Sequence, residues 1–522
     1  MSATWLNNAI FYEIYPQSFY DSNGDGIGDI PGIISKLDYI KSLGCNALWI
    51  NPCFDSPFKD AGYDVRDYKK VAPRYGTNED LQRLFQIAHE KGIHVLLDLV
   101  PGHTSEEHPW FLESTKAEKN EFSDRYIWTS NAFMPGDGMP FVGGEFPRNG
   151  TYILNFFKCQ PALNYGYLKK NFNWQKSMDD PACEATLEAM LDVMRFWLDL
   201  GCDGYRVDMA ASLVKNDDEA YSGTSKIWQK VRKMLDAEYP EAALLAEWNM
   251  PQFSLKAGFD MDFYLDWYGN GYSSLMRDYE GNMDSEIRQP NNSYFKRDAK
   301  SDVSRFLADY LPKYEASKKD GLWCFITCNH DSLRPAPALD TEELKLAYAF
   351  LFTMPGAPFV YYGDEIGMRY RKLPTHEGGY HRTGSRTPMQ WAPGKNLGFS
   401  TATPEKLYLP VDPDMDAPTV VEQEEDPDSL LQFTRTLLHL RLNTPELQAY
   451  SPFEVVSARE GERLFAYRRG NLLCAVNPSE QWQSLSLDGS YETLFAYGDC
   501  AIKDGALILD GPAFVILKPE NE

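Results

Sequence analysis

Polar side chains that could do chemistry stand at the ends of several short apolar runs of this chain. These runs include HVLLDLV (94–100), DGYRVDM (203–209), ALLAEW (243–248) and FITCNH (325–330). If the runs are strands of a parallel barrel, the polar residues at their C-terminal ends point into a common site. The residues in this position are Asp98, His103, Arg206, Asp208, Glu247, His330 and Asp331.

Carboxylates gathered in this way need a purpose, because they repel one another and raise each other's pKa. Retaining glycoside hydrolysis supplies one: an ionised carboxylate attacks the anomeric carbon, and a carboxylic acid about 5–5.5 Å away protonates the leaving oxygen. Asp208 follows Arg206 on the same strand face, and we expect that cation to keep it ionised. Glu247 has no basic neighbour in sequence and stands beside Trp248, and an apolar setting that raises its pKa suits the acid. The competing interpretation is a set of salt bridges at strand ends.

The apolar runs alternate with amphipathic stretches, which predicts βα units and a parallel sheet. Helix-like stretches include 35–44, 79–92, 185–201 and 341–353. Runs at 10–15, 46–50 and 358–365 add to the strands above, and 260–267 would supply an eighth strand and close a barrel. The predicted fold class is therefore α/β, a (β/α)8 TIM barrel.

Two stretches interrupt this alternation. Residues 104–165 are rich in Gly, Pro, Asn and aromatic residues without helical periodicity, which indicates a domain inserted after the third strand. Beyond about residue 450, short alternating runs separated by Gly and Asn predict an antiparallel β-sandwich. We expect a barrel over 1–103 and 166–450, an inserted domain over 104–165 and a C-terminal domain over 451–522.

The composition excludes several classes of protein. The chain has 522 residues, 43% hydrophobic and 24% charged, which is typical of a globular protein with a sizeable core. A formal net charge of −25 would repel nucleic acid and anionic membranes. The nine cysteines are scattered without a CxxC pair, so we expect reduced thiols. With neither a signal-like N-terminus nor a long apolar run, the expected location is cytoplasmic, without a membrane partner.

Four stretches in order along the chain resemble motifs of the α-amylase family of glycoside hydrolases: DLVPGH (98–103), GYRVDMA (204–210), LLAEWN (244–249) and FITCNHD (325–331). The resemblance covers nearly the whole length and implies a (β/α)8 barrel with an inserted domain and a C-terminal β domain. It implies that Asp208 is the nucleophile, Glu247 the general acid/base, and Asp331 the carboxylate that holds sugar hydroxyls. The implied binders of the hydroxyls and the transition state are His103, Arg206 and His330.

Further stretches are similar to oligo-1,6-glucosidases and their relatives: QPALN (160–164), SRTPMQW (385–391) and MPGAPFVYYGDEIGM (354–368). GYDVRDY (62–68) resembles a stretch where a Tyr stacks on the nonreducing-end sugar and an Asp binds its hydroxyls, which implies these roles for Tyr63 and Asp64. We expect Arg386 to pair with Asp64 and close the pocket beyond the first sugar, which makes the enzyme exo-acting. Phe157 completes the predicted substrate-binding residues.

The chain departs from the family patterns at three positions. Gly102 stands where the family usually has an Asn that in many α-amylases ligates calcium, and Ala162 replaces the Asp of QPDLN. Met209 follows the nucleophile, where relatives tend to carry Val for α-1,6 bonds and Ala or Thr for α-1,4 bonds. Since Met is long and adaptable, the preferred linkage stays open.

A second motif, DSNGDGIGD (21–29), alternates hard oxygen ligands around a Gly turn, as calcium loops do. An EF-hand would need an acid where Gly32 stands, so this loop is not one. It resembles the N-terminal metal loop of oligo-1,6-glucosidase relatives. The resemblance implies structural Ca²⁺, with Mg²⁺ as the alternative and no organic cofactor, and as ligands Asp21, Asn23, Asp25, the Ile27 carbonyl and Asp29. An Asx-rich turn without metal is the other interpretation.

These patterns predict a retaining α-glucosidase that hydrolyses nonreducing-end α-1,4 or α-1,6 bonds of short gluco-oligosaccharides through a glucosyl-enzyme intermediate. The alternatives within the family are a glucosyl transferase or isomerase, trehalose synthase-like or sucrose-isomerising, and an endo-acting α-amylase. From another class, the amylase-like ectodomains of amino-acid transporter heavy chains would need a membrane span and degraded carboxylates. We expect an oligosaccharide substrate and a monomer or weak homo-oligomer.

Overall fold

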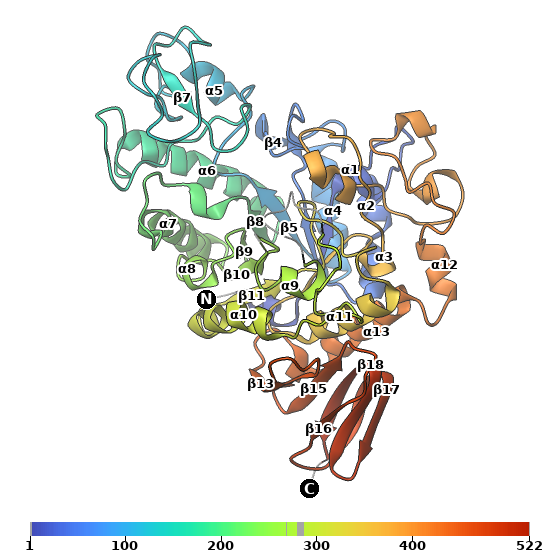
Figure 1. Ribbon diagram of the computed structural model, residues 1–522. Coiled ribbons are helices and arrows are strands. Elements are labelled where there is room, and N and C mark those ends of the chain that lie inside the picture. The colour runs from blue at the N-terminus through green and yellow to red at the C-terminus, as the bar shows by residue number, and fades with distance from the viewer. Residues whose placement is uncertain (1–2, 268, 279–286, 521–522) are drawn as a thin grey trace.

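Eight short parallel strands form the centre of the molecule (Figure 1). The computed structural model describes residues 3–267, 269–278 and 287–520. The sheet order is β11-β10-β9-β8-β5-β2-β1-β12, and a parallel bridge between Ile326 and Phe359 joins its two ends into a barrel. In chain order the strands are β1 (Phe11–Ile14), β2 (Ala47–Ile50), β5 (His94–Leu99), β8 (Gly204–Val207), β9 (Ala243–Ala246), β10 (Met261–Tyr264), β11 (Leu322–Phe325) and β12 (Phe359–Tyr361).

The predicted barrel is confirmed, including the eighth strand at β10. Strands buried on both faces read as continuous apolar runs, and every residue of β1, β2, β9 and β11 is buried. The prediction for the seventh strand began too late. β11 ends at Phe325, and residues 326–331 leave the barrel as the loop that carries His330 and Asp331.

Helices cover the outside of the barrel. Two of them begin with capping boxes, Thr77 with Asp80 and Asp340 with Glu343, which satisfy the free amide groups of the first turn. Helices follow their strands as α2 (Ile30–Ser35), α3 (Leu37–Leu43), α4 (Asn78–Glu90), α6 (Pro181–Asp199), α7 (Ser222–Glu238), α8 (Pro251–Ser254), α10 (Ser304–Ser317), α11 (Thr341–Thr353) and α13 (Leu430–Asn443). Shorter elements are α1 (Pro16–Phe19), β3 (Phe54–Asp55), β4 (Asp67–Val71), α9 (Ser273–Met276) and α12 (Val420–Glu425).

The segment between β5 and α6 extends from the barrel, as predicted for an insertion after the third strand (Figure 1). It holds α5 (Pro109–Ser114) and a two-stranded sheet of β6 (Phe141–Gly143) and β7 (Thr151–Ile153). Its own small core includes Ile127, Ile153 and Ala162. Ala162 is fully buried in this cluster, which explains why an apolar residue occupies the position of an Asp in the QPDLN pattern.

Antiparallel strands make up the C-terminal part. They are β13 (Phe453–Ala458), β14 (Phe465–Arg469), β15 (Leu472–Asn477), β16 (Gln483–Ser486), β17 (Tyr491–Lys503) and β18 (Ala506–Pro519). One hydrogen-bonded sheet contains all six, where we expected two sheets, because the long β18 pairs with β15, β16 and β17. Aromatic contacts join the sheet to the barrel helices, such as Phe350 with Tyr467 and Phe433 with Tyr497.

Within the described ranges, every helix falls short of the length and apolarity that a membrane crossing requires. All nine cysteines are free thiols, as expected for a reduced protein, and all except Cys500 are buried.

Candidate active site

A pocket of about 730 Å³ opens at the C-terminal ends of the barrel strands. It lies within the size range of small-molecule sites. Six of the predicted site residues line it: Tyr63, His103, Phe157, Asp208, Glu247 and Asp331. Arg206, His330 and Arg386 lie behind this lining as buried partners, whereas Asp64 is turned away from the pocket. Met209, which we expected beside the nucleophile, also lines the pocket, and lining residues that we did not predict include Asp60, Phe156, Trp248, Tyr380 and Arg382.

Arg206 of β8 lies at the centre of the acidic groups. Its Nη1 is 2.8 Å from Asp98 Oδ1 and 3.2 Å from Asp208 Oδ1, and its Nη2 is 2.9 Å from Glu247 Oε2. The expectation that Glu247 has an apolar setting without a cation is therefore wrong. Arg206 lies at the end of β8 and Glu247 follows the neighbouring β9, so the barrel brings together groups that are distant in sequence.

Asp208 and Glu247 form an interacting pair. Burial and the charge of Glu247 raise the pKa of Asp208 well above its usual range. Arg206 opposes this shift but does not cancel it, so Arg206 alone does not keep Asp208 ionised as we expected. Burial also raises the pKa of Glu247, against the attraction of Arg206. Two carboxyl groups that share one guanidinium titrate together, and the raised pKa values favour a state in which the pair holds one proton. Such a pair can supply one nucleophile and one acid.

Asp331 has the opposite electrostatic setting. Its Oδ1 accepts hydrogen bonds from Arg382 Nη1 at 3.0 Å and Arg386 Nη2 at 2.9 Å, and its Oδ2 is 3.1 Å from His330 Nε2. Burial alone would raise the pKa of Asp331, but His330 and the two arginines hold it well below its usual range. Asp331 is therefore ionised, and it can accept hydrogen bonds from sugar hydroxyls.

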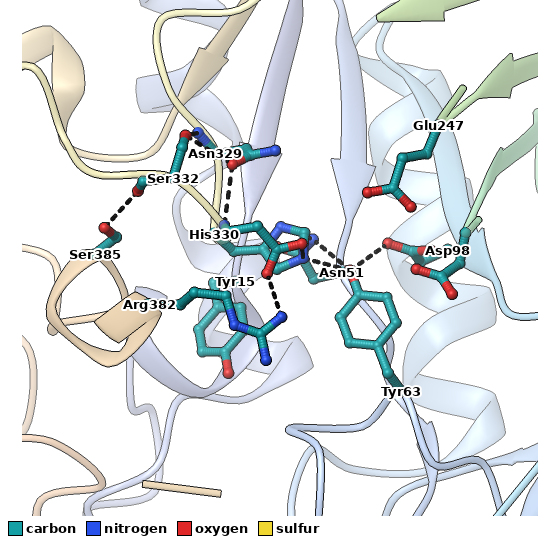
Figure 2. A network of polar contacts seen from close by, with 12 residues as sticks. Tyr15, Asn51, Tyr63, Asp98, Glu247, Asn329, His330, Ser332, Arg382 and Ser385 are labelled. Atoms are coloured by element: carbon teal, nitrogen blue, oxygen red, sulfur yellow. Dashed lines mark hydrogen bonds and ion pairs between the residues drawn. The ribbon is translucent and has the colours of Figure 1, made fainter. Parts of the chain in front are cut away.

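His330 is held from both sides (Figure 2). Its Nδ1 is 2.9 Å from Glu13 Oε1, and its Nε2 is 2.7 Å from the Tyr63 hydroxyl. Although burial disfavours the imidazolium, Asp331 and Glu13 raise the pKa of His330. The Tyr63 ring stacks on the imidazole at 5.3 Å, and its hydroxyl donates to Asp98 at 3.0 Å. Glu13, a fully buried residue of β1, was not predicted, since nothing in its sequence neighbourhood marks it.

His103 is held by the inserted segment. Its Nε2 donates to the Tyr63 carbonyl at 3.0 Å, and its Nδ1 accepts from Asn155 Nδ2 at 3.1 Å. Burial lowers the pKa of His103 to about 4, so its imidazole is neutral. A side chain at Gly102 would meet the Asn155 amide at 2.7 Å, so a larger residue there would require the Asn155 side chain to move. Asn155 Oδ1 accepts in turn from Lys215 Nζ at 2.9 Å.

The expected ion pair between Asp64 and Arg386 does not form. The Asp64 carboxylate accepts hydrogen bonds from Ser56 Oγ and from two backbone amides of its own turn, all within 3.0 Å. Arg386 contacts Asp331 instead. The two motifs meet through another pair, Asp60 and Arg382, at 3.5 Å, and both residues line the pocket. Asp60 is four residues before Asp64, and Arg382 is four residues before Arg386. The predicted ion pair was therefore placed in the right stretches of sequence but assigned to the wrong residues.

The predicted metal loop is closed by its own hydrogen bonds. Asp21 accepts from the amides of Gly24 and Gly26 at 2.7 and 2.8 Å, and Asp29 accepts from the amide of Gly32 at 2.6 Å. No group of three or more His, Cys, Asp or Glu that could hold a metal ion occurs among residues 3–267, 269–278 and 287–520. These hydrogen bonds are those of an Asx-rich turn, and they do not test whether Asp21, Asn23, Asp25, the Ile27 carbonyl and Asp29 bind a metal. Calcium at this loop stays a prediction, and no catalytic step depends on it.

Comparison with known proteins identifies the class to which this barrel and site belong. Residues 13–449 match the alpha amylase catalytic domain. The chain belongs to the α-amylase family of glycoside hydrolases, as its motifs indicated.

Among particular relatives, trehalose synthase/amylase TreS of Mycobacterium tuberculosis is 33% identical, over 93% of this chain and 84% of that protein. Oligo-1,6-glucosidase of Heyndrickxia coagulans is 31% identical, over 95% of this chain and 99% of that protein. The trehalulose synthase MutB from Pseudomonas mesoacidophila has a similar structure, with a TM-score of 0.80, 26% identity and 99% of both chains covered. An α-glucosyl transfer enzyme, XgtA, has a TM-score of 0.78 at 27% identity, covering 98% of this chain and 99% of that chain.

Proposed function

We propose that this protein acts on the nonreducing-end α-glucosyl residue of short α-1,4- or α-1,6-linked oligosaccharides, as a retaining α-glucosidase. The observation that carries this proposal is the ion pair between Asp60 and Arg382, which lie 3.5 Å apart among the pocket-lining residues. We propose that this pair forms a blind end of the pocket beyond the first sugar, so that one terminal sugar fits and a continuing polysaccharide does not. This replaces the Asp64–Arg386 closure and supports the same exo-acting mode.

The proposed reaction has two displacements. Asp208 attacks the anomeric carbon as Glu247 gives its proton to the leaving oxygen, so the glycosidic bond breaks while an ester bond to Asp208 forms. Glu247, now ionised, then takes a proton from water, whose oxygen attacks the same carbon and releases Asp208 as a carboxylate. Glucose leaves with its α configuration, and both carboxyl groups return to their starting states.

The remaining groups are proposed to bind the first sugar. Asp331 is ionised and carries two arginine contacts, so it offers acceptor oxygens to hydroxyl groups. His330, His103 and Phe157 are proposed to contact the same sugar from the barrel and the inserted segment. Tyr63 offers its ring face for stacking, a contact that aromatic side chains make with apolar sugar faces.

A second candidate is a glucosyl transferase or isomerase that uses the same intermediate. Trehalose synthases are among the relatives with 33–36% identity, and sugar-isomerising and glucosyl-transfer enzymes share the fold. An aromatic group beside the pocket is compatible with an acceptor sugar: Phe156, Phe157 and Tyr380 lie in ring contact at 4.4 and 5.7 Å. Aromatic ring faces beside the pocket would favour a sugar over water as the acceptor.

Chromatographic product analysis tests these alternatives. The purified protein is incubated separately with maltose, isomaltose, sucrose, trehalose and soluble starch. Glucose from short substrates, with starch untouched, is the expected result. New disaccharides with little glucose would assign the second candidate, and maltodextrins from starch would contradict the closed pocket.

A further inference from the structure

The loop that follows Glu247 is bound by one buried carboxylate. Asp262 lies on β10, the strand beside β9, and is fully buried. Its Oδ1 accepts hydrogen bonds from the amides of Trp248 and Asn249 at 3.1 and 3.0 Å, and its Oδ2 accepts from the Met250 amide at 3.0 Å. Three consecutive amides thus point at a single carboxyl group, an arrangement that favours its charged form. Burial nevertheless raises the pKa of Asp262 to about 7, and these hydrogen bonds oppose that rise.

Two further contacts fix the same loop. Ser254 Oγ, in α8, donates to Asp262 Oδ2 at 2.7 Å, and Asn249 Oδ1 accepts from the Leu265 amide at 3.2 Å. Asn249 has a φ of 60°, a left-handed conformation that aims successive amides to one side. The loop is therefore attached to β10 by both its backbone and a side chain.

Glu247 stands immediately before these bound amides. Its own amide donates to the Val207 carbonyl at 3.1 Å, next to Asp208, and its Oε2 accepts from the Met209 amide at 2.8 Å. The backbone is thus held on both sides of the Glu247 Cα, by β8 before it and by Asp262 after it. Figure 2 shows the Glu247 side chain at the end of its strand with its carboxyl group near Asp98. We infer that the two backbone attachments set this direction.

We propose that Asp262 is a positioning residue for the general acid/base, whose carboxylate fixes the 248–250 loop so that Glu247 faces the leaving-group oxygen. This inference rests on the proposed function, in which Glu247 donates the proton. Asp262 touches neither the substrate nor the reacting atoms, because it is buried behind the loop.

The test compares two substrates that differ in their need for an acid. Maltose has a poor leaving group and needs the proton from Glu247, whereas α-glucosyl fluoride loses fluoride without it. In Asp262→Asn, the amide group cannot accept from all three backbone donors. A small displacement of a catalytic group costs about a hundredfold in rate, so kcat/KM for maltose is expected to fall by about that factor. For the fluoride, kcat/KM, which reports only glucosyl-enzyme formation, is expected to change little.

The second half of the reaction gives an independent readout. Water needs Glu247 as a base, so the kcat for the fluoride falls in Asp262→Asn and added azide, which needs no base, restores it as glucosyl azide forms. The matched control is Asp260→Asn. Asp260 precedes the same strand and binds the Leu244 amide at 2.8 Å and Arg232, at the opposite end of β9. This variant is expected to lower the melting temperature and leave the ratio of the two kcat/KM values unchanged.

An equal loss on both substrates, or no loss on maltose, would overturn the proposal. If Asp262→Asn does not fold, Asn249→Gly serves instead, because glycine accepts the left-handed φ and only the Leu265 contact is lost. It is expected to show a smaller loss of the same selective kind, and an unchanged ratio would again overturn the proposal. Wild-type protein that cleaves neither substrate would instead contradict the proposed function, and the inference with it.

Discussion

At the scale of single residues, the carboxyl groups of the site differ in how many cationic partners they have and in the direction of their pKa shifts. Asp208 and Glu247 share Arg206, and burial raises the pKa of both, with the charge of Glu247 adding to the rise at Asp208 and the charge of Asp331 adding to the rise at Glu247. Asp331 has three cationic partners, which hold its pKa well below the usual range. The lowered pKa favours the charged form of Asp331 for binding, while the raised pKa values of the other two favour a pair that holds one proton for chemistry.

The shared proton predicts a bell-shaped dependence of kcat/KM on pH. Activity falls as pH drops and both Asp208 and Glu247 become protonated, because the nucleophile is lost. It also falls as pH rises through the raised pKa of the pair, because the acid is lost. In Glu247→Gln with α-glucosyl fluoride, the alkaline limb is expected to disappear while the acidic limb remains. An alkaline limb that persists in this variant would assign it to another group.

Glu13 is predicted to set the charge of His330. In Glu13→Gln the anionic partner at Nδ1 is replaced by a neutral amide of similar shape, so the pKa of His330 is expected to fall. Histidine NMR titration measures this shift directly. Glu365→Gln is the matched control, because Glu365 is equally buried but accepts from Tyr12 and Tyr39, away from the pocket. An unchanged His330 titration in Glu13→Gln would contradict the role of Glu13.

Arg382 is predicted to contribute to binding of the terminal sugar. Arg382→Ala removes contacts with Asp331 and Asp60, so the KM for maltose is expected to rise about tenfold, with a smaller change in kcat. Arg371→Ala is the control. Arg371 pairs with Asp412 and Asp414 and is not among the pocket-lining residues. Equal KM values for wild-type protein and Arg382→Ala would contradict the blind-end interpretation.

Site residues at the ends of predicted strands could be predicted from the sequence. Residues that only the folded barrel brings to the site could not. Asp208 and Glu247 directly follow β8 and β9, Asp331 lies in the loop after β11, and all three line the pocket. Glu13 and Asn51 belong to the same His330 cluster, but their partner is far away in sequence. The Arg206–Glu247 contact could not be read from sequence neighbours, because it joins two adjacent strands of the closed barrel.

At the scale of elements, the strands carry the framework and the loops after them carry the chemistry. Seven strand predictions overlap the observed strands, since residues buried on two faces give clear apolar runs. The seventh strand was placed late because FITC continues the apolar character beyond Phe325, where hydrogen bonding to β10 has ended. A run of apolar residues indicates that a segment is buried, but it does not show at which residue the strand ends.

The loop at 21–29 allows a test of the metal prediction. If calcium binds there, removing it with EDTA is expected to lower the melting temperature, and added calcium restores it, because a ligand at 100 times its Kd stabilises by about 2.7 kcal/mol. The variant Asp21→Asn should lose the response to calcium. Identical melting curves with EDTA and with calcium would leave the loop as an Asx-rich turn.

At the scale of the whole molecule, three parts meet around one pocket. The barrel supplies the carboxylates, the inserted segment supplies Phe156 and Phe157, and the 380–382 loop supplies Tyr380 and Arg382. The net charge of −25 repels polyanions and is compatible with a neutral sugar. The fold and family could be predicted from the sequence because the motifs are spread over the whole chain. The choice between water and sugar as acceptor could not, because it depends on how the inserted segment and the 380–382 segment come together beside the pocket.

The central claim is that the reaction passes through a glucosyl ester on Asp208. We would incubate the Glu247→Gln variant with α-glucosyl fluoride, digest the protein and measure its peptides by mass spectrometry. Without a base, the intermediate should accumulate, and we predict that the peptide containing Asp208 gains the mass of one glucosyl residue. The Asp208→Asn protein should gain none and should lose at least about a thousandfold in kcat on maltose. Fluoride release without an adduct on Asp208, or an adduct on another residue, would contradict the proposed mechanism.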